Sequence, residues 1–183
     1  MRRSTSRSAV RVGLRPTASI STREPGSAAA ATSQKAADEN GEPRGTVVVE
    51  GDRAEAIVIA PEEVPGLIDE LPAIAALAAH GGEVTVRGAG ELRVKESDRI
   101  SALVAGFRAL GIDADERDDG FVIRGRSGRR PIGGVADARG DHRMAMAFAI
   151  AALAAEGPST IDGAEAVNIS YPGFFETLER LVS

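Results

Sequence analysis

Strands and helices alternate along most of this chain, and the order of their alternation repeats. Runs of β-branched residues predict strands, and apolar residues spaced by three and four predict helices. From residue 56 the predicted order is strand, helix, strand, helix, strand, strand, and it then restarts as strand, helix, strand, helix. Predicted strands cover residues 46–50, 56–60, 83–87, 112–116, 120–124, 133–138 and 159–161, and predicted helices cover residues 73–80, 100–110, 144–155 and a C-terminal segment with Phe174, Leu178 and Leu181 on one face. The pattern predicts an α/β fold made of repeated units.

The repeat is incomplete at both ends of the chain. The second copy lacks its last two strands, and the strand at residues 46–50 has the position of the last strand of a still earlier copy. We therefore expect a fragment of a larger protein, in which the missing strands come from elsewhere. Open strand edges of this kind tend to self-associate.

Residues 1–44 differ in composition from the rest. The first 23 residues contain six Arg and no Asp or Glu, and the segment that follows is rich in Ala, Gly, Pro and Ser. Such a composition predicts a disordered tail, followed by a partial lobe over residues 45–183. The Arg- and Ser-rich start is also typical of an organelle transit peptide. We favour an unstructured tail or a misassigned gene start.

The overall composition narrows the classes of function. The net charge of −5 argues against a nucleic-acid partner, and no apolar run is long enough for a membrane span. The chain has no Cys and two His, so thiolate sites are excluded and histidine metal sites are disfavoured. We expect a cytoplasmic protein that needs no cofactor and no metal.

A charged cluster opens the helix predicted at residues 100–110. Lys95, Glu96 and Arg99 lie just before or at its start, where free backbone N–H groups and the helix dipole favour a bound anion. The cations suit phosphate or carboxylate, and Glu96 is suited to proton transfer. The alternative is a solvated, salt-bridged helix start.

Two further polar groups also precede helices. Asp69 lies before the helix at residues 73–80, and Asp141, His142 and Arg143 open the helix at residues 144–155. Asp69 has an alternative role as an N-cap near Pro72. Asp141 is interpreted as a cap or as an orienter of Arg143, and His142 as a buried hydrogen-bonding residue. If the three helix starts converge, the residue types fit acid–base chemistry on a phosphorylated substrate.

Four motifs in this order resemble the enolpyruvyl-shikimate-phosphate synthase family. They are IDELP at residues 68–72, LRVKESDR at 92–99, DHRMAM at 141–146 and SYPGFF at 170–175, within a resemblance that covers residues 45–183. The resemblance implies an inside-out α/β barrel of two lobes, each with three βαβαββ units. It also implies transfer of the enolpyruvyl group of phosphoenolpyruvate to the 5-hydroxyl of shikimate 3-phosphate.

The resemblance also implies roles for five residues. Asp69 and Glu96 would be the acid–base groups, with Asp69 also contacting the shikimate ring. Lys95 would bind shikimate 3-phosphate, and Arg99 and Arg143 would bind phosphoenolpyruvate.

Some parts of the family pattern are missing. The N-terminal lobe that carries the other half of the site is absent, so it would be a partner. Ile169 stands where some relatives have a phosphoenolpyruvate-binding lysine. Another class of function is therefore a non-catalytic remnant or a phosphate-ligand-binding module that needs a partner lobe. The related transferase of cell-wall synthesis is disfavoured, because it typically uses a cysteine acid.

Overall fold

The structure is a computed structural model of the 183-residue chain. It describes residues 9–12, 30–39, 42–50, 56–94, 98–125 and 129–182. Lys95 and Glu96, two of the expected site residues, lie outside these ranges.

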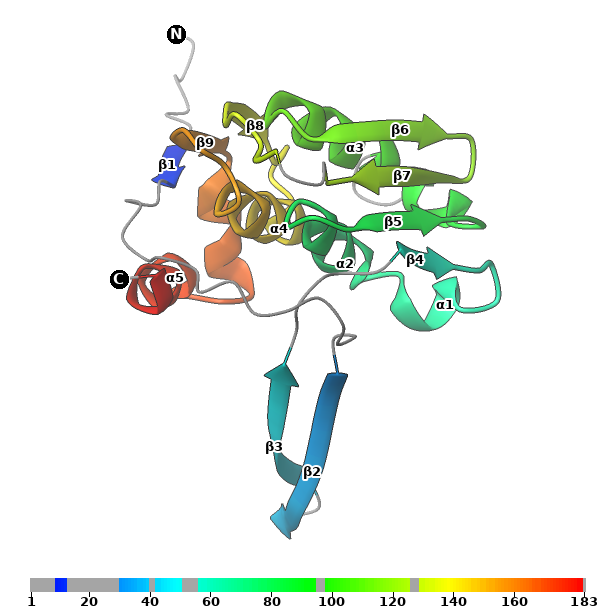
Figure 1. The fold of residues 1–183 in the computed structure, drawn as a ribbon, viewed down its shortest axis with the longest axis vertical. Coiled ribbons are helices and arrows are strands. Elements are labelled where there is room, and N and C mark those ends of the chain that lie inside the picture. The colour runs from blue at the N-terminus through cyan, green and yellow to red at the C-terminus, as the bar shows by residue number, and fades with distance from the viewer. Residues whose placement is uncertain are drawn as a thin grey trace, which may run out of the picture.

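The first repeat unit is complete and follows the predicted order. Strand β4 (Ala56–Ile59) is followed by α1 (Val64–Leu67), α2 (Leu71–Ala78) and β5 (Glu83–Val86), and then by the 3₁₀ helix η1 (Gly90–Val94), α3 (Arg99–Ala109), β6 (Asp113–Arg117) and β7 (Gly120–Arg124). The sheet order is β4-β5-β7-β6, with β4 parallel to β5 and the other pairs antiparallel. Helices α2 and α3 pack on this sheet (Figure 1). This unit is βαβαββ, as expected.

The second unit repeats the first in a shorter form. It contains β8 (Val135–Asp137), α4 (His142–Ala152), β9 (Ser159–Asp162), the 3₁₀ helix η2 (Ala164–Ile169) and α5 (Phe174–Val182). Strands β8 and β9 are parallel, like β4 and β5. The N-terminal strand β1 (Ala9–Val12) pairs antiparallel with β9, and the sheet order is β1-β9-β8. Relative to β9, β1 therefore takes the place that β7 takes relative to β5.

Strands also occur in the segment that composition predicts to be disordered. Besides β1, strand β2 (Ala30–Glu39) forms an antiparallel hairpin with β3 (Glu42–Glu50), with an irregularity between Lys35 and Ala37. The hairpin projects from the rest of the chain in Figure 1. Within this two-stranded sheet, pairing satisfies the backbone groups of each strand that face the other strand, despite the polar composition of β2. The boundary between residues 44 and 45 falls within β3, and the remainder of residues 1–44 lies outside the described part.

Helix α4 is the centre of the hydrophobic core. Seven of its residues are buried, as its apolar sequence predicts, and it contacts α2, α3, β9 and η2. The rings of Phe148 in α4 and Phe107 in α3 meet edge to face, with centroids 5.6 Å apart. Gly106 lets α3 approach this closely, because a Cβ at that position would overlap the Phe148 ring.

The predicted face of the C-terminal helix is only partly buried. In α5, Phe174 is buried and Leu178 packs against the core, whereas Leu181 is 77% exposed.

Across the described ranges, no helix combines the length and apolar character that crossing a membrane requires.

Candidate active site

Three helix starts that are far apart in the sequence meet around the Asp69 carboxylate. Asp69 lies just before α2, Arg99 is the first residue of α3, and Arg143 lies in the first turn of α4. The Nη2 of Arg143 is 3.2 Å from Oδ2 of Asp69, and the Nη1 of Arg99 is 3.5 Å from Oδ1. Arg143 Nη1 also donates a hydrogen bond to the Asp69 carbonyl at 2.9 Å. The structure thus brings three of the five expected site residues together.

Asp141 supports this cluster with both of its carboxylate oxygens. Oδ1 accepts the backbone N–H groups of Arg143 at 2.9 Å and Met144 at 3.4 Å, so Asp141 is the N-cap of α4, as predicted. Oδ2 accepts the Nε–H of Arg99 at 2.7 Å. The side chains of Arg99 and Asp141 are only 5% and 4% exposed. A buried ion pair with Asp141 therefore fixes the position of Arg99. Sequence patterns predicted Arg99 as a site residue but did not predict this ion pair.

The N-cap alternative for Asp69 is not what the structure has. Helix α2 begins at Leu71, and its N-cap residue is Glu70, which makes no side-chain cap hydrogen bond. The Asp69 side chain is instead directed to two guanidinium groups and is 45% exposed. His142 is half-buried, less than the expected buried position.

Lys95 and Glu96 lie in a short segment whose two flanks are tied together. Arg93 Nη1 donates to Oδ2 of Asp98 at 2.7 Å and to Oε1 of Glu116 at 2.9 Å. Arg93 also donates to the carbonyls of Arg117, the last residue of β6, and Asp118, in the turn that follows. Arg93 thereby joins Asp98 to the end of β6. Its position within the LRVKESDR motif was the available sequence signal, but its partners on β6 were not predictable locally.

The carboxylates that face Arg93 have lowered pKa values. Burial acts to raise the pKa of Asp98, but hydrogen bonds from the Ser101 backbone N–H and from Arg93 lower it overall. Hydrogen bonds from the Ser101 hydroxyl and from Arg93 lower the pKa of Glu116. The same hydrogen bond between Arg93 and Glu116 helps to raise the pKa of Arg93. Asp98 also caps α3 through Ser101, so this charge network fixes the helix start that carries Arg99.

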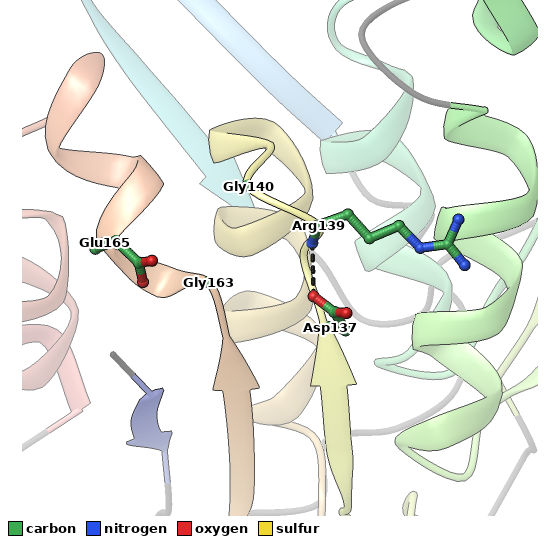
Figure 2. A pocket seen from close by; sticks show the side chains of 5 residues that line it. All are labelled: Asp137, Arg139, Gly140, Gly163 and Glu165. Carbon is green, nitrogen blue, oxygen red and sulfur yellow. Dashed lines mark hydrogen bonds between the residues drawn. The ribbon is translucent and has the colours of Figure 1, made fainter. Parts of the chain in front are cut away.

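A cavity of about 300 Å³ lies at the carboxyl ends of β8 and β9. Asp137, Arg139, Gly140, Gly163 and Glu165 line it. Arg139 has a φ of +53°, and its backbone N–H donates to Oδ1 of Asp137 at 2.8 Å. Figure 2 shows its side chain extending away from Glu165. None of the lining residues belongs to the Asp69 cluster, so the cavity is a separate feature.

The described ranges contain no group of three or more His, Asp or Glu side chains arranged to hold a metal ion. What the Asp69 cluster offers is two guanidinium groups for anionic oxygens and one accessible carboxylate for a proton.

Comparison with known proteins connects this geometry to one family. The family profile described as EPSP synthase (3-phosphoshikimate 1-carboxyvinyltransferase) matches residues 21–178. This match begins before the expected boundary at residue 45 and includes all of the Asp69 cluster.

Individual relatives carry the same name. The 3-phosphoshikimate 1-carboxyvinyltransferase of Syntrophomonas wolfei is 50% identical over 79% of this chain and 34% of its own length. That of Roseiflexus castenholzii is 47% identical over 78% of this chain and 33% of its own length. The chain therefore spans about one third of the length of the curated relatives it matches.

Solved structures agree with the sequence matches. EPSP synthase from Acinetobacter baumannii superposes with a TM-score of 0.74 at 39% identity, over 83% of this chain and 36% of that one. The enolpyruvyl transferase NikO from Streptomyces tendae has a TM-score of 0.55 at 22% identity, over 75% of this chain and 31% of that one, which shows a shared fold. The chain belongs to the EPSP synthase (3-phosphoshikimate 1-carboxyvinyltransferase) family.

Proposed function

We propose that this chain supplies one side of an active site that transfers the enolpyruvyl group of phosphoenolpyruvate to the 5-hydroxyl of shikimate 3-phosphate. The observation that carries the proposal is the convergence of Asp69, Arg99 and Arg143 from three helix starts. Family membership supports the choice of reaction, and the proposal includes a cytoplasmic location.

The reaction needs proton transfers and anion binding. A base takes the 5-hydroxyl proton while the oxygen bonds to the central carbon of phosphoenolpyruvate, and an acid protonates the methylene carbon. Loss of a proton from the new methyl group then expels phosphate. In our assignment Asp69 and Glu96 are the acid–base groups, with Asp69 also contacting the shikimate ring.

The cations divide the anionic groups between them in this proposal. Lys95 binds shikimate 3-phosphate, whereas Arg99 and Arg143 bind the carboxylate and phosphate of phosphoenolpyruvate. Two features support the arginine assignment. Arg99 is held rigid by Asp141, and Arg143 is 33% exposed beside it. Ile169, which is 79% exposed, supplies no charge at the position of the lysine in some relatives.

The proposal requires a partner lobe. Catalysis needs the reacting groups held together in a closed site, and this chain spans about a third of its relatives. We propose that the missing N-terminal lobe of the same family completes the site. The isolated chain should then show no measurable turnover.

Phosphate release from phosphoenolpyruvate and shikimate 3-phosphate tests the proposal. The full chain is assayed alone and mixed with the complementary N-terminal part of the Syntrophomonas wolfei relative. We expect activity only in the mixture, and none when the mixture contains Asp69→Asn. An active isolated chain would refute the need for a partner lobe. A mixture that forms a complex but remains inactive would favour a non-catalytic binding module.

A further inference from the structure

The Asp69 carboxylate lies where an anionic ligand of Arg99 and Arg143 would be bound. Its two oxygens are divided between the two guanidinium groups, with Oδ1 3.5 Å from Arg99 and Oδ2 3.2 Å from Arg143. Phosphate and carboxylate groups bind guanidinium groups through the same kind of oxygen pair. We propose that Asp69 is an intramolecular competitor for the anion site, and that binding of a phosphate-bearing ligand displaces its carboxylate. This inference rests on the proposed function, because it takes Arg99 and Arg143 as the anion-binding groups.

The contacts of Arg99 separate a permanent partner from an exchangeable one. Asp141 accepts its Nε–H at 2.7 Å in a pair that is almost fully buried, whereas Asp69 approaches its Nη1 only to 3.5 Å and is 45% exposed. Breaking a fully buried pair at short distance is costly, whereas a longer contact to a half-exposed carboxylate is weaker and easier to exchange. Displacement of Asp69 therefore leaves Arg99 in place.

Arg143 also keeps its position when the carboxylate moves. Its Nη1 donates to the backbone carbonyl of Asp69 at 2.9 Å, a contact that does not involve the Asp69 side chain. Its own backbone N–H donates to Asp141. Only the carboxylate has to rotate away, and the anion then contacts the two guanidinium groups without any change in their positions.

This exchange couples binding to proton transfer. While the Asp69 carboxylate contacts both arginines, its oxygens are engaged by cations. Once an anion replaces it, the carboxylate is released beside the bound ligand and is available to take a proton. The predicted order is anion binding first and action of the base second.

Binding of inorganic phosphate to the full chain tests the inference without any need for turnover. Isothermal titration calorimetry would compare the wild type with Asp69→Asn and with Glu70→Gln. Glu70 is a matched control, because it is the neighbouring residue, carries the same charge and is exposed. Asp69→Asn preserves the backbone carbonyl that holds Arg143.

We expect Asp69→Asn to bind phosphate about three- to tenfold more tightly than the wild type, and Glu70→Gln to bind as the wild type does. The gain should disappear in the double variant with Arg143→Gln, which places the phosphate at this site. Equal or weaker binding by Asp69→Asn would overturn the inference, and so would an equal gain in Glu70→Gln. The activity of the two-part mixture is measured separately, so the proposed function can survive that outcome.

Discussion

Asp141 and Arg99 form a buried ion pair across 42 residues of sequence, with 2.7 Å between Oδ2 and Nε. The same carboxylate caps α4 through its other oxygen. One side chain thus fixes the start of α4 and the guanidinium at the start of α3. The relative position of two helix starts at the site depends on this pair.

Asp141→Asn should separate the two roles of this residue. Asn is as good an N-cap as Asp, so the cap is kept, whereas the buried Arg99 charge loses its partner. We expect the free energy of unfolding to fall by about 3 kcal/mol or more, measured by urea denaturation. Asp98→Asn is the control, because Asp98 also caps a helix and pairs with an arginine but is 36% exposed. A loss in Asp141→Asn no larger than in the control would contradict a stabilising role for the buried pair.

Close packing of α3 against α4 should appear as coupling between Gly106 and Phe148. Gly106→Ala introduces a methyl group that overlaps the Phe148 ring and should cost about 1 to 3 kcal/mol. Phe148→Leu removes the overlap and also the contact with Phe107. The double variant should therefore be more stable than the sum of the two single losses predicts, measured by a thermodynamic cycle. Additive losses would argue against this contact.

Acid should destabilise the Arg93 network. The pKa values of Asp98 and Glu116 are lowered in the folded chain, so each contributes stability above its unfolded pKa, near 4, and loses it as the pH falls through the lower folded value. The free energy of unfolding should therefore decrease below about pH 4. Arg93→Met removes a common partner of both carboxylates. The free energy of unfolding of this variant should therefore decrease less steeply with falling pH than that of the wild type. Urea titrations between pH 3 and 7 measure both slopes, and equal slopes would contradict this assignment.

Strand β1 lies before the family match, yet it pairs with β9 as β7 pairs with β5. Thr160 donates its N–H toward β8, so the backbone groups of Ser159 and Ile161 face β1. Val10 lies opposite Ile161, and Val10→Pro removes a donor from this ladder. We expect the amide hydrogens of Ser159 and Ile161 to exchange faster in Val10→Pro than in the wild type.

Arg11→Pro is the matched control for this strand. The N–H of Arg11 faces away from β9 by the same alternation, so a proline is tolerated there. Equal exchange rates at Ile161 in the two proline variants would show that β1 does not pair with β9 in the second unit.

Local sequence patterns predicted most elements of the two units. The turn residues Asp118 and Asp119 predicted the β6–β7 hairpin, and the spacing of apolar residues predicted α3 and α4. Helix α1 was not predicted, because it is only four residues long and contains Pro65 and Gly66, which are typical of a break. Both 3₁₀ helices were also missed, since they lack a long periodic signal.

The site was predictable only in part. Residue types and motif resemblance selected Asp69, Arg99 and Arg143, and the structure places these three together. Their partners could not be predicted, because the Arg99–Asp141 pair and the Arg93–Glu116 pair join residues that only the tertiary fold brings close. The roles of Lys95 and Glu96 rest on the resemblance, since these residues lie outside the described ranges.

In our proposal, three helix starts form one anion-binding site around Asp69. A crystal structure of the full chain at saturating inorganic phosphate would show whether they do. We predict a phosphate with oxygens within hydrogen-bond distance of the Arg99 and Arg143 guanidinium groups, and the Asp69 carboxylate displaced from both. A second cavity of about 500 Å³ is partly lined by Arg124, Arg129 and Arg130. Phosphate bound only there, with none at Arg99 and Arg143, would contradict an anion site around Asp69.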